Sequence, residues 1–134
     1  MSTETMHENC AIVRRGYDAL NTADLAALTE LFDEHASWHT PGQSPLAGDA
    51  DGREAVFSQF GRYAEETGGT FTADLKRVLT DEEDRVIGIH HTVAERGDKR
   101  LDIYGCIVFE LVDGRIVDGR EHFYDLPAWD EFWS

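Results

Sequence analysis

Two titratable residues in the last third of the chain, His90 and Glu121, are the strongest candidates for chemistry. They lie in strand-like segments on either side of a middle segment that contains Gly105. If Gly97 and Asp98 form a two-residue turn, His90 lies opposite Gly105. A glycine at that position leaves room for an imidazole and a carboxylate to approach each other above the sheet. Such a couple can pass a proton at neutral pH, as a general acid or base must.

The position of Glu121 depends on the register of the second hairpin, which the sequence leaves open. A two-residue turn of Asp113 and Gly114 places Glu121 opposite Cys106, on the other face of the sheet. A bulged three-residue loop with a left-handed glycine places it opposite Gly105. One residue of register moves every side chain to the other face. We favour the bulged hairpin, because it puts Glu121 on the same face as the apolar inner side chains of the middle strand.

In the favoured register His90, Gly105 and Glu121 form one row across three strands. The two outer strands of that row are about 9–10 Å apart, because neighbouring strands are spaced by about 4.8 Å. An apolar pocket would raise the pKa of Glu121, whereas pairing with His90 would favour the two charged forms. The opposite orientation is also open. Ile87, Ile89 and Val93 of the predicted strand at 85–96 share a face with His91, and burial of that face would leave His90 toward solvent.

Other residues are candidates for the wall of a pocket that binds a substrate. Trp38 and Thr40 alternate on a short predicted strand and would supply an aromatic surface and one hydroxyl. Tyr17 lies on the apolar stripe of the first helix, where a role in the core is equally open. The remaining candidates are apolar residues that either line the cavity or fill it: Phe57, Phe60, Ile107, Phe109 and Phe123.

Charge limits the classes of partner. The 134 residues include 27 acidic and 12 basic side chains, which gives a net charge of −15. A surface this negative repels nucleic-acid phosphates and anionic lipid headgroups, so we expect neither nucleic acid nor membrane as a partner. The acidic run at 81–84 is expected to form a solvated turn. His90, His91 and Glu121 lack a tight ligand spacing such as HExxH, so we assign no metal.

Cysteine use and hydropathy favour a protein of the cytoplasm. Cys10 and Cys106 are far apart and form no CxxC pair, so we expect small buried side chains rather than a disulfide framework. No apolar run is long enough to span a bilayer, and no signal-peptide pattern opens the chain. The expected location is therefore cytoplasmic.

The elements that must position these residues follow from hydrophobic periodicity. Thr22 is expected to cap the second helix, and the Pro/Gly-rich stretch at 41–52 is expected to be a loop. Helices that precede an antiparallel meander are typical of an α+β domain with the helices on one sheet face. The predicted helices cover about 6–20, 25–32, 53–66 and 126–133, and the predicted strands cover about 35–40, 71–75, 85–96, 100–112 and 115–124.

This order resembles the SnoaL-like group of the nuclear transport factor two-like fold. The stretch YDALNTADLAALTELFDEHASWHTPG is similar to the opening of that family, and GRIVDGREHFYDLPAWDEFW is similar to its last strand and tail. The resemblance covers nearly the whole chain and implies one domain over residues 1–134. It implies a cone-shaped α+β barrel, in which three N-terminal helices pack on a curved, mostly antiparallel sheet. Because this fold hosts isomerases, hydrolases, cyclases and binders, the resemblance specifies fold more than function.

Two enzymes of the fold test the resemblance. Ketosteroid isomerases use a tyrosine, an aspartate base and a later acid, and alignment puts Gly16, Thr40 and Ile107 at those positions. That mechanism therefore does not carry over, and Tyr17 lies one residue away, about 100° around the helix.

Limonene epoxide hydrolase, the second enzyme, uses an Asp-Arg-Asp set. Alignment puts Glu121 and His90 at the two aspartates and Gly88 at the arginine. The position of the site is therefore retained without its cation, which leaves the epoxide-opening reaction unsupported.

These observations favour an enzyme without a cofactor that performs acid/base chemistry on a hydrophobic small molecule with a polar tip. Isomerisation, cyclisation of a polyketide-like compound and hydrolytic ring opening all fit. The alternative is a non-catalytic module that uses the pocket or the sheet to hold a ligand or partner. A homodimer is also expected, through the outer sheet face around Tyr104, Cys106 and Val108, because that face would otherwise expose excess apolar surface.

Overall fold

The computed structural model describes residues 3–81 and 84–134, so Glu82 and Glu83 of the expected acidic turn lie outside the described residues. The predicted order of helices and strands is confirmed, with one additional strand. In chain order the elements are α1 (Thr3–Asn21), α2 (Leu25–Leu31), β1 (Phe32–Thr40), β2 (Gly48–Asp51), α3 (Arg53–Glu66), β3 (Thr72–Thr80), β4 (Arg85–Arg96), β5 (Lys99–Val112), β6 (Arg115–Phe123) and α4 (Leu126–Trp133).

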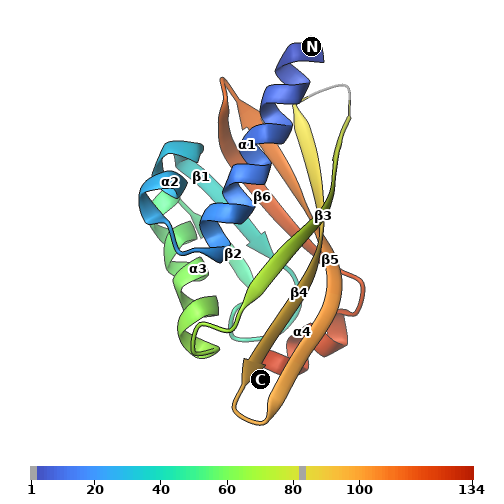
Figure 1. Ribbon diagram of the computed structural model, residues 1–134. Helices are drawn as coiled ribbons and strands as arrows, with labels where there is room; N and C mark the ends of the chain where they lie inside the picture. Colours follow the sequence, from blue (N-terminus) through green and yellow to red (C-terminus); the bar gives the residue numbers. More distant parts are fainter. Residues whose placement is uncertain (1–2, 82–83) are drawn as a thin grey trace.

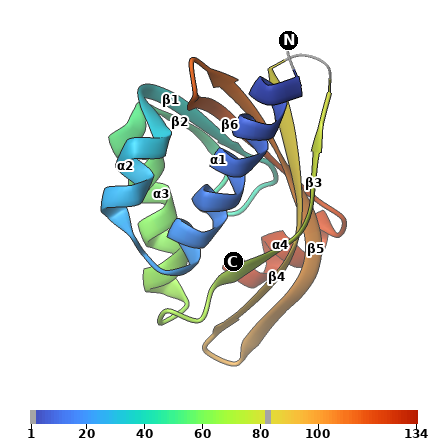
Figure 2. The same ribbon diagram turned by 45° about the horizontal axis from the view of Figure 1, so that its top comes forward.

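The strands form one curved six-stranded sheet in the order β2-β1-β6-β5-β4-β3. Only the β1–β6 pair is parallel among the described strand pairs. Figure 1 and Figure 2 show α1, α2 and α3 on one side of this sheet, with α4 near the far end of β4 and β5. The predicted α+β fold, with helices on a curved and mostly antiparallel sheet, is therefore confirmed.

The junction between α1, α2 and β1 differs from the prediction. Asp24, not Thr22, caps α2, because its carboxylate accepts a hydrogen bond from the backbone N–H of Ala27 at 3.1 Å. The hydroxyl of Thr22 instead donates to the carbonyl of Asp18 at the end of α1. Phe32 begins β1 rather than ending the helix. The N-cap of α2 is therefore Asp24, two residues after the predicted Thr22.

Two strands were missed or shortened in the sequence interpretation. β2 lies inside the predicted loop at 41–52 and pairs with the end of β1, with Thr40 opposite Gly48. β3 continues past its predicted end to Thr80, across a register shift between Leu75 and Arg77. Both strands are sheet edges with mostly exposed side chains. Edge strands of this kind lack the alternating apolar pattern that identifies a half-buried strand.

The first hairpin follows the predicted register, because His90 lies directly opposite Gly105. His90 is only 2% exposed and lies on the inner face of the sheet. The alternative orientation, with His90 toward solvent, is therefore wrong, and His91 is the outward residue of the pair.

The second hairpin contradicts both registers considered from the sequence. Its turn is the two-residue Asp113–Gly114 turn, with φ of 50° and 77°, as a type I′ turn requires. A register shift beyond Glu110 then adds one residue on β6. Glu121 consequently lies opposite Ile107, on the inner face but two residues from the predicted row. The expectation that His90 and Glu121 share a row is therefore wrong.

Gly119 of β6 lets the indole of Trp38 lie directly against the sheet. A Cβ atom at this position would collide with the six-membered ring of Trp38, which is rigid and buried. We expect Gly119→Ala to lower the free energy of unfolding by about 1–3 kcal/mol, the usual cost of overpacking. Urea denaturation measures this change. Gly61→Ala is the control, because a Cβ atom there meets nothing within 4 Å and alanine is the better helix former; a stable Gly119→Ala protein would contradict the packing argument.

Candidate active site

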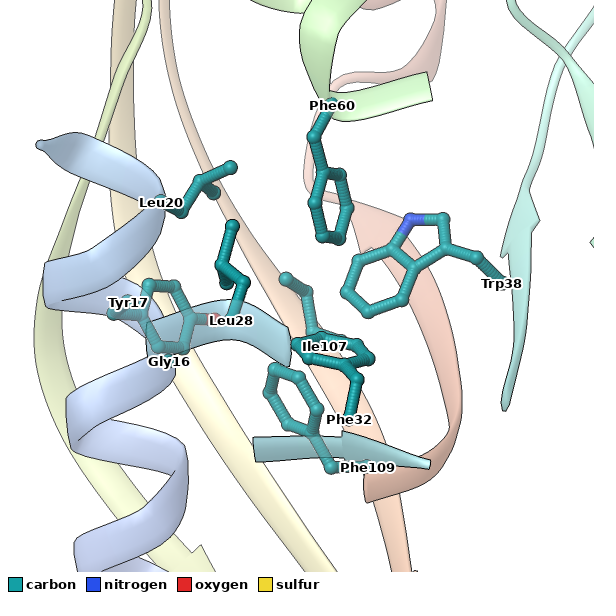
Figure 3. A pocket seen from close by; sticks show the side chains of 9 residues that line it. All are labelled: Gly16, Tyr17, Leu20, Leu28, Phe32, Trp38, Phe60, Ile107 and Phe109. Carbon is teal, nitrogen blue, oxygen red and sulfur yellow. The ribbon is translucent and has the colours of Figure 1, made fainter. Parts of the chain in front are cut away.

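A small apolar cavity lies between α1, α2 and the inner face of the sheet, as Figure 3 shows. The space open to the centre of a water-sized sphere is about 20 Å³, roughly what one water molecule needs. Five of the predicted wall residues do line it, namely Tyr17, Trp38, Phe60, Ile107 and Phe109. The others that line it are Gly16, Leu20, Leu28 and Phe32.

The remaining predicted residues lie around this cavity. Phe57 lines a neighbouring pocket between α2 and α3. Thr40 lines a third pocket beneath β2. Phe123 stacks on Trp129 of α4, with ring centroids 3.9 Å apart. His90 and Glu121 are not among the residues that line the cavity, and both are buried behind its wall.

Glu121 is a buried carboxyl surrounded by neutral hydrogen-bond donors. Its Oε2 atom accepts hydrogen bonds from the hydroxyls of Thr40 and Tyr63, each at 2.8 Å. The indole N–H of Trp38 lies near the carboxylate but makes no hydrogen bond with it in the described geometry. Burial raises the pKa of Glu121 from 4.5 to about 7, and the neighbouring donors offset part of that rise. With that pKa, Glu121 is present in both protonation states near neutral pH.

Two residues of α3 that the sequence analysis missed hold this carboxyl in place. The side-chain N–H group of Gln59 lies 2.7 Å from the carbonyl oxygen of Leu46, and 3.3 Å from each of the Thr40 and Tyr63 hydroxyls. Gln59 thereby ties both donors of Glu121 to the loop before β2. The four-residue spacing of Gln59 and Tyr63, beside the apolar stripe of α3, was the available signal in the sequence.

His90 is held separately, by Tyr17. Nδ1 of the imidazole lies 2.8 Å from the phenolic oxygen of Tyr17, which is also 3.4 Å from the carbonyl of Gly88. Burial lowers the pKa of His90 from 6.5 to about 4, so the ring is neutral at pH 7. His90 and Glu121 form no ion pair, and the predicted charged couple is therefore wrong.

The expected approach of an imidazole and a carboxylate over Gly105 does not occur, because Glu121 lies opposite Ile107. A Cβ atom at residue 105 would collide with the backbone carbonyl of His122, 2.8 Å away, so Gly105 makes room for that carbonyl, whereas the 3.5 Å to Nε2 of His90 is an ordinary contact. Gly88 likewise makes room for the phenol of Tyr17. Burial, followed by the nearby charge of Glu121, raises the pKa of Tyr17 well above its ordinary value. Tyr17 is therefore a neutral phenol whose ring lines the cavity and whose hydroxyl contacts His90.

Comparison with known proteins identifies the family. A model of the SnoaL-like domain matches residues 13–119. An uncharacterized protein of Mycobacterium tuberculosis is 33% identical over 123 residues, which cover 92% of this chain and 94% of the relative. The chain belongs to the SnoaL-like family.

Solved structures share the fold of this SnoaL-like domain. The structure of Bal32a, from a soil-derived mobile gene cassette, is 65% identical with a TM-score of 0.94, and the match covers 96% of this chain and 98% of Bal32a. A putative SnoaL-like polyketide cyclase from Jannaschia is 16% identical with a TM-score of 0.77, over 96% of this chain and 92% of that one. At that identity the second match shows the fold alone, which is also the fold of solved NTF2-like proteins.

The SnoaL-like domain lacks the base of one enzyme compared above and the cation of the other. Thr40, where ketosteroid isomerases have their base, donates a hydrogen bond to Glu121. Gly88, where limonene epoxide hydrolase has its arginine, lies beneath Tyr17. The buried carboxyl is therefore oriented by neutral hydroxyls and an amide rather than by a cation.

Neither a cluster of metal ligands nor a membrane-spanning helix is present in the described residues. Over residues 3–81 and 84–134, no group of three or more His, Cys, Asp or Glu side chains is arranged to hold a metal ion. Within the same residues, no helix has the length and apolar character needed to cross a bilayer. Cys10 and Cys106 are both free thiols that are partly buried.

Proposed function

We propose that this SnoaL-like domain is an enzyme that performs acid/base chemistry, without a cofactor, on a hydrophobic small molecule with a polar end. One observation carries the proposal: the carboxyl of Glu121 is buried at the end of an aromatic interior with only neutral hydroxyls as hydrogen-bond partners among the described residues, and this burial raises its pKa to about 7. A carboxyl with that pKa is present in both protonation states at neutral pH, so it can serve as acid and as base. The fold it shares with polyketide cyclases is consistent with this chemistry.

In this proposal each polar residue has a defined part. Glu121 transfers the proton, with Thr40 and Tyr63 stabilising its charged form through their 2.8 Å hydrogen bonds. The ring of Tyr17 forms part of the wall that the substrate contacts, and the contact of its hydroxyl with His90 holds that ring in place. The apolar body of the substrate packs against Trp38, Phe60, Ile107 and Phe109, with Phe57 and Phe123 supporting the wall. Isomerisation and cyclisation can begin with such a proton transfer, and hydrolysis can use it to activate an attacking water molecule.

A non-catalytic binding or dimeric interaction module is the second candidate. The observation that favours it is the size of the cavity, because about 20 Å³ of free space is far below the several hundred Å³ of ordinary ligand pockets. In the enzyme, substrate binding must move side chains of the wall to reach Glu121. In the binding module, the aromatic interior is simply a packed core and the carboxyl is structural.

The experiment that separates the two candidates uses the compound that co-purifies with the protein. Mass spectrometry of a solvent extract identifies it, and turnover of that compound is then compared between the wild type and Glu121→Gln. The enzyme requires turnover by the wild type that the variant loses. Binding of the compound without turnover by either protein assigns the binding module, and equal turnover by both removes Glu121 from the mechanism.

A homodimer through the outer sheet face is a further proposal. Tyr104 on this face is 43% exposed and stacks on His91, with Cys106 and Val108 beside it. We expect light scattering at micromolar concentration to give twice the chain mass of 15.1 kDa, and Tyr104→Glu to give a monomer because it buries a charge in the interface. Ala11→Glu, on the exposed side of α1, is the control and should remain a dimer. A monomeric wild type would contradict the proposal.

A further inference from the structure

A second apolar pocket opens at the surface between α2 and α3. We call it the mouth, and its walls include Leu20, Leu25, Leu28, Phe60, Gly61 and Ala64. The space open to the centre of a water-sized sphere is about 140 Å³, which is several times that of the inner cavity. Leu25, at its rim, is 60% exposed. Together with the apolar lining of the hollow, this leucine forms a continuous apolar surface of the kind at which apolar molecules bind.

The mouth and the inner cavity share three residues. Leu20, Leu28 and Phe60 line both, so these side chains separate the two spaces. Figure 3 shows them converging from α1, α2 and α3 above Ile107. The ring of Phe60 packs edge-on against Trp38, with centroids 4.9 Å apart. A rotation of Phe60 would join the two spaces and open a path along Trp38 toward Glu121.

Gly61 is an independent observation that points to the same place. It lies in the middle of α3, where glycine costs about 0.5–1 kcal/mol relative to alanine. A Cβ atom at this position meets nothing within 4 Å, so no neighbouring group requires a glycine. A larger side chain would instead extend into the mouth. The glycine therefore leaves this part of the mouth unfilled, at the expense of helix stability.

We infer that the mouth is both the entrance to the active site and a binding site for the tail of an elongated, uncharged, apolar substrate. Its residues offer only apolar side chains, which select against a charged tail. The polar end of the same molecule passes Phe60 and reaches Tyr17 and Glu121. This inference rests on the proposed function, because it takes the interior to be a substrate site.

The test uses N-phenyl-1-naphthylamine, a neutral apolar fluorophore, and stopped-flow fluorescence on the full chain. Gly61→Leu fills the mouth. Gly16→Leu fills the inner cavity, where a Cβ atom would contact Ile116 at an ordinary 3.8 Å. Ser58→Leu adds the same side chain to an exposed position of α3 that does not line the mouth. Thermal melts of all variants check folding, and we expect Gly61→Leu to melt no lower than the wild type because leucine is a good helix former.

We expect Gly61→Leu to slow association of the probe by about tenfold or more, because the entrance must first reopen, whereas Ser58→Leu binds as the wild type does. If Gly16→Leu blocks binding and Gly61→Leu does not, the entrance lies elsewhere; the inference is then overturned while the interior remains a binding site. If neither Gly16→Leu nor Gly61→Leu changes binding, the probe does not enter the interior, and the proposed function fails together with the inference.

Discussion

We expect Glu121→Gln to stabilise the protein by about 3 kcal/mol more above pH 7 than at low pH. The same change should remove most of the turnover. The pKa of Glu121 is about 7 in the folded chain against 4.5 for the unfolded reference, and each unit of difference is worth about 1.4 kcal/mol. Below pH 4.5 the carboxyl is neutral in both states and costs nothing. Between pH 4.5 and 7 the unfolded chain ionises while the folded chain keeps this carboxyl protonated, so the free energy of unfolding falls progressively, and the loss is complete above pH 7.

Glutamine avoids that loss because it is neutral at every pH, and its amide oxygen can accept the same bonds from Thr40 and Tyr63. Urea denaturation of both proteins between pH 4 and pH 8 measures the difference. Turnover should fall by about 10²–10⁴, the usual contribution of a general acid or base. A difference that does not grow with pH would show that the carboxyl titrates normally, and would remove the basis of the proposed mechanism.

The long elements of the fold could be predicted because their apolar residues repeat with a clear period. α1, α3 and the strands β4 to β6 bury one face each, so the sequence carries their signal directly. β2, with the sequence GDAD, buries almost nothing. Its pairing with β1 comes from the way the preceding loop returns to the sheet, which no local pattern records.

The face of Glu121 was predicted correctly but for a wrong reason. In the predicted register the extra residue lies in the turn. In the structure the turn has two residues, and the extra residue lies farther along β6. A bulge anywhere between the turn and residue 121 gives the same face, so alternation alone fixes the face and leaves the row open. The row decides which groups meet, and it separates Glu121 from His90.

The hydrogen-bonding partners of the two groups were beyond the reach of strand patterns. Tyr63 reaches Glu121, and Gln59 reaches Thr40, because α3 packs across the end of β1, and this angle between helix and sheet is a property of the packed core. Tyr17 was identified as a wall residue from its stripe on α1, but its contact with His90 depends on the space left by Gly88. Pairwise contacts between distant elements therefore had to come from the structure.

His90→Phe is expected to change stability with pH in the opposite direction to Glu121→Gln. Burial lowers the pKa of His90 from 6.5 to about 4, so the folded chain resists protonation. The stability that this neutral ring contributes is present above pH 6.5 and is lost as the pH falls toward 4, by about 3 kcal/mol. Phenylalanine cannot be protonated, so the variant does not lose stability over this pH range through residue 90. At pH 7.5 the variant should be less stable by about 1–2 kcal/mol, because Tyr17 loses a hydrogen-bond partner.

The wild type hides both effects, because between pH 4.5 and 6.5 the contributions of His90 and Glu121 run in opposite directions and nearly cancel. Urea denaturation of both single variants and the double variant, from pH 4 to pH 8, separates them. Neither residue contributes to the pKa shift of the other, so we expect the two free-energy changes to add within about 0.5 kcal/mol at each pH. A charged His90–Glu121 pair would instead make each single variant strand a buried charge, and the double variant would then recover much of the loss. Additivity would thus assign the proton exchange of the site to Glu121 alone, with His90 acting only through Tyr17.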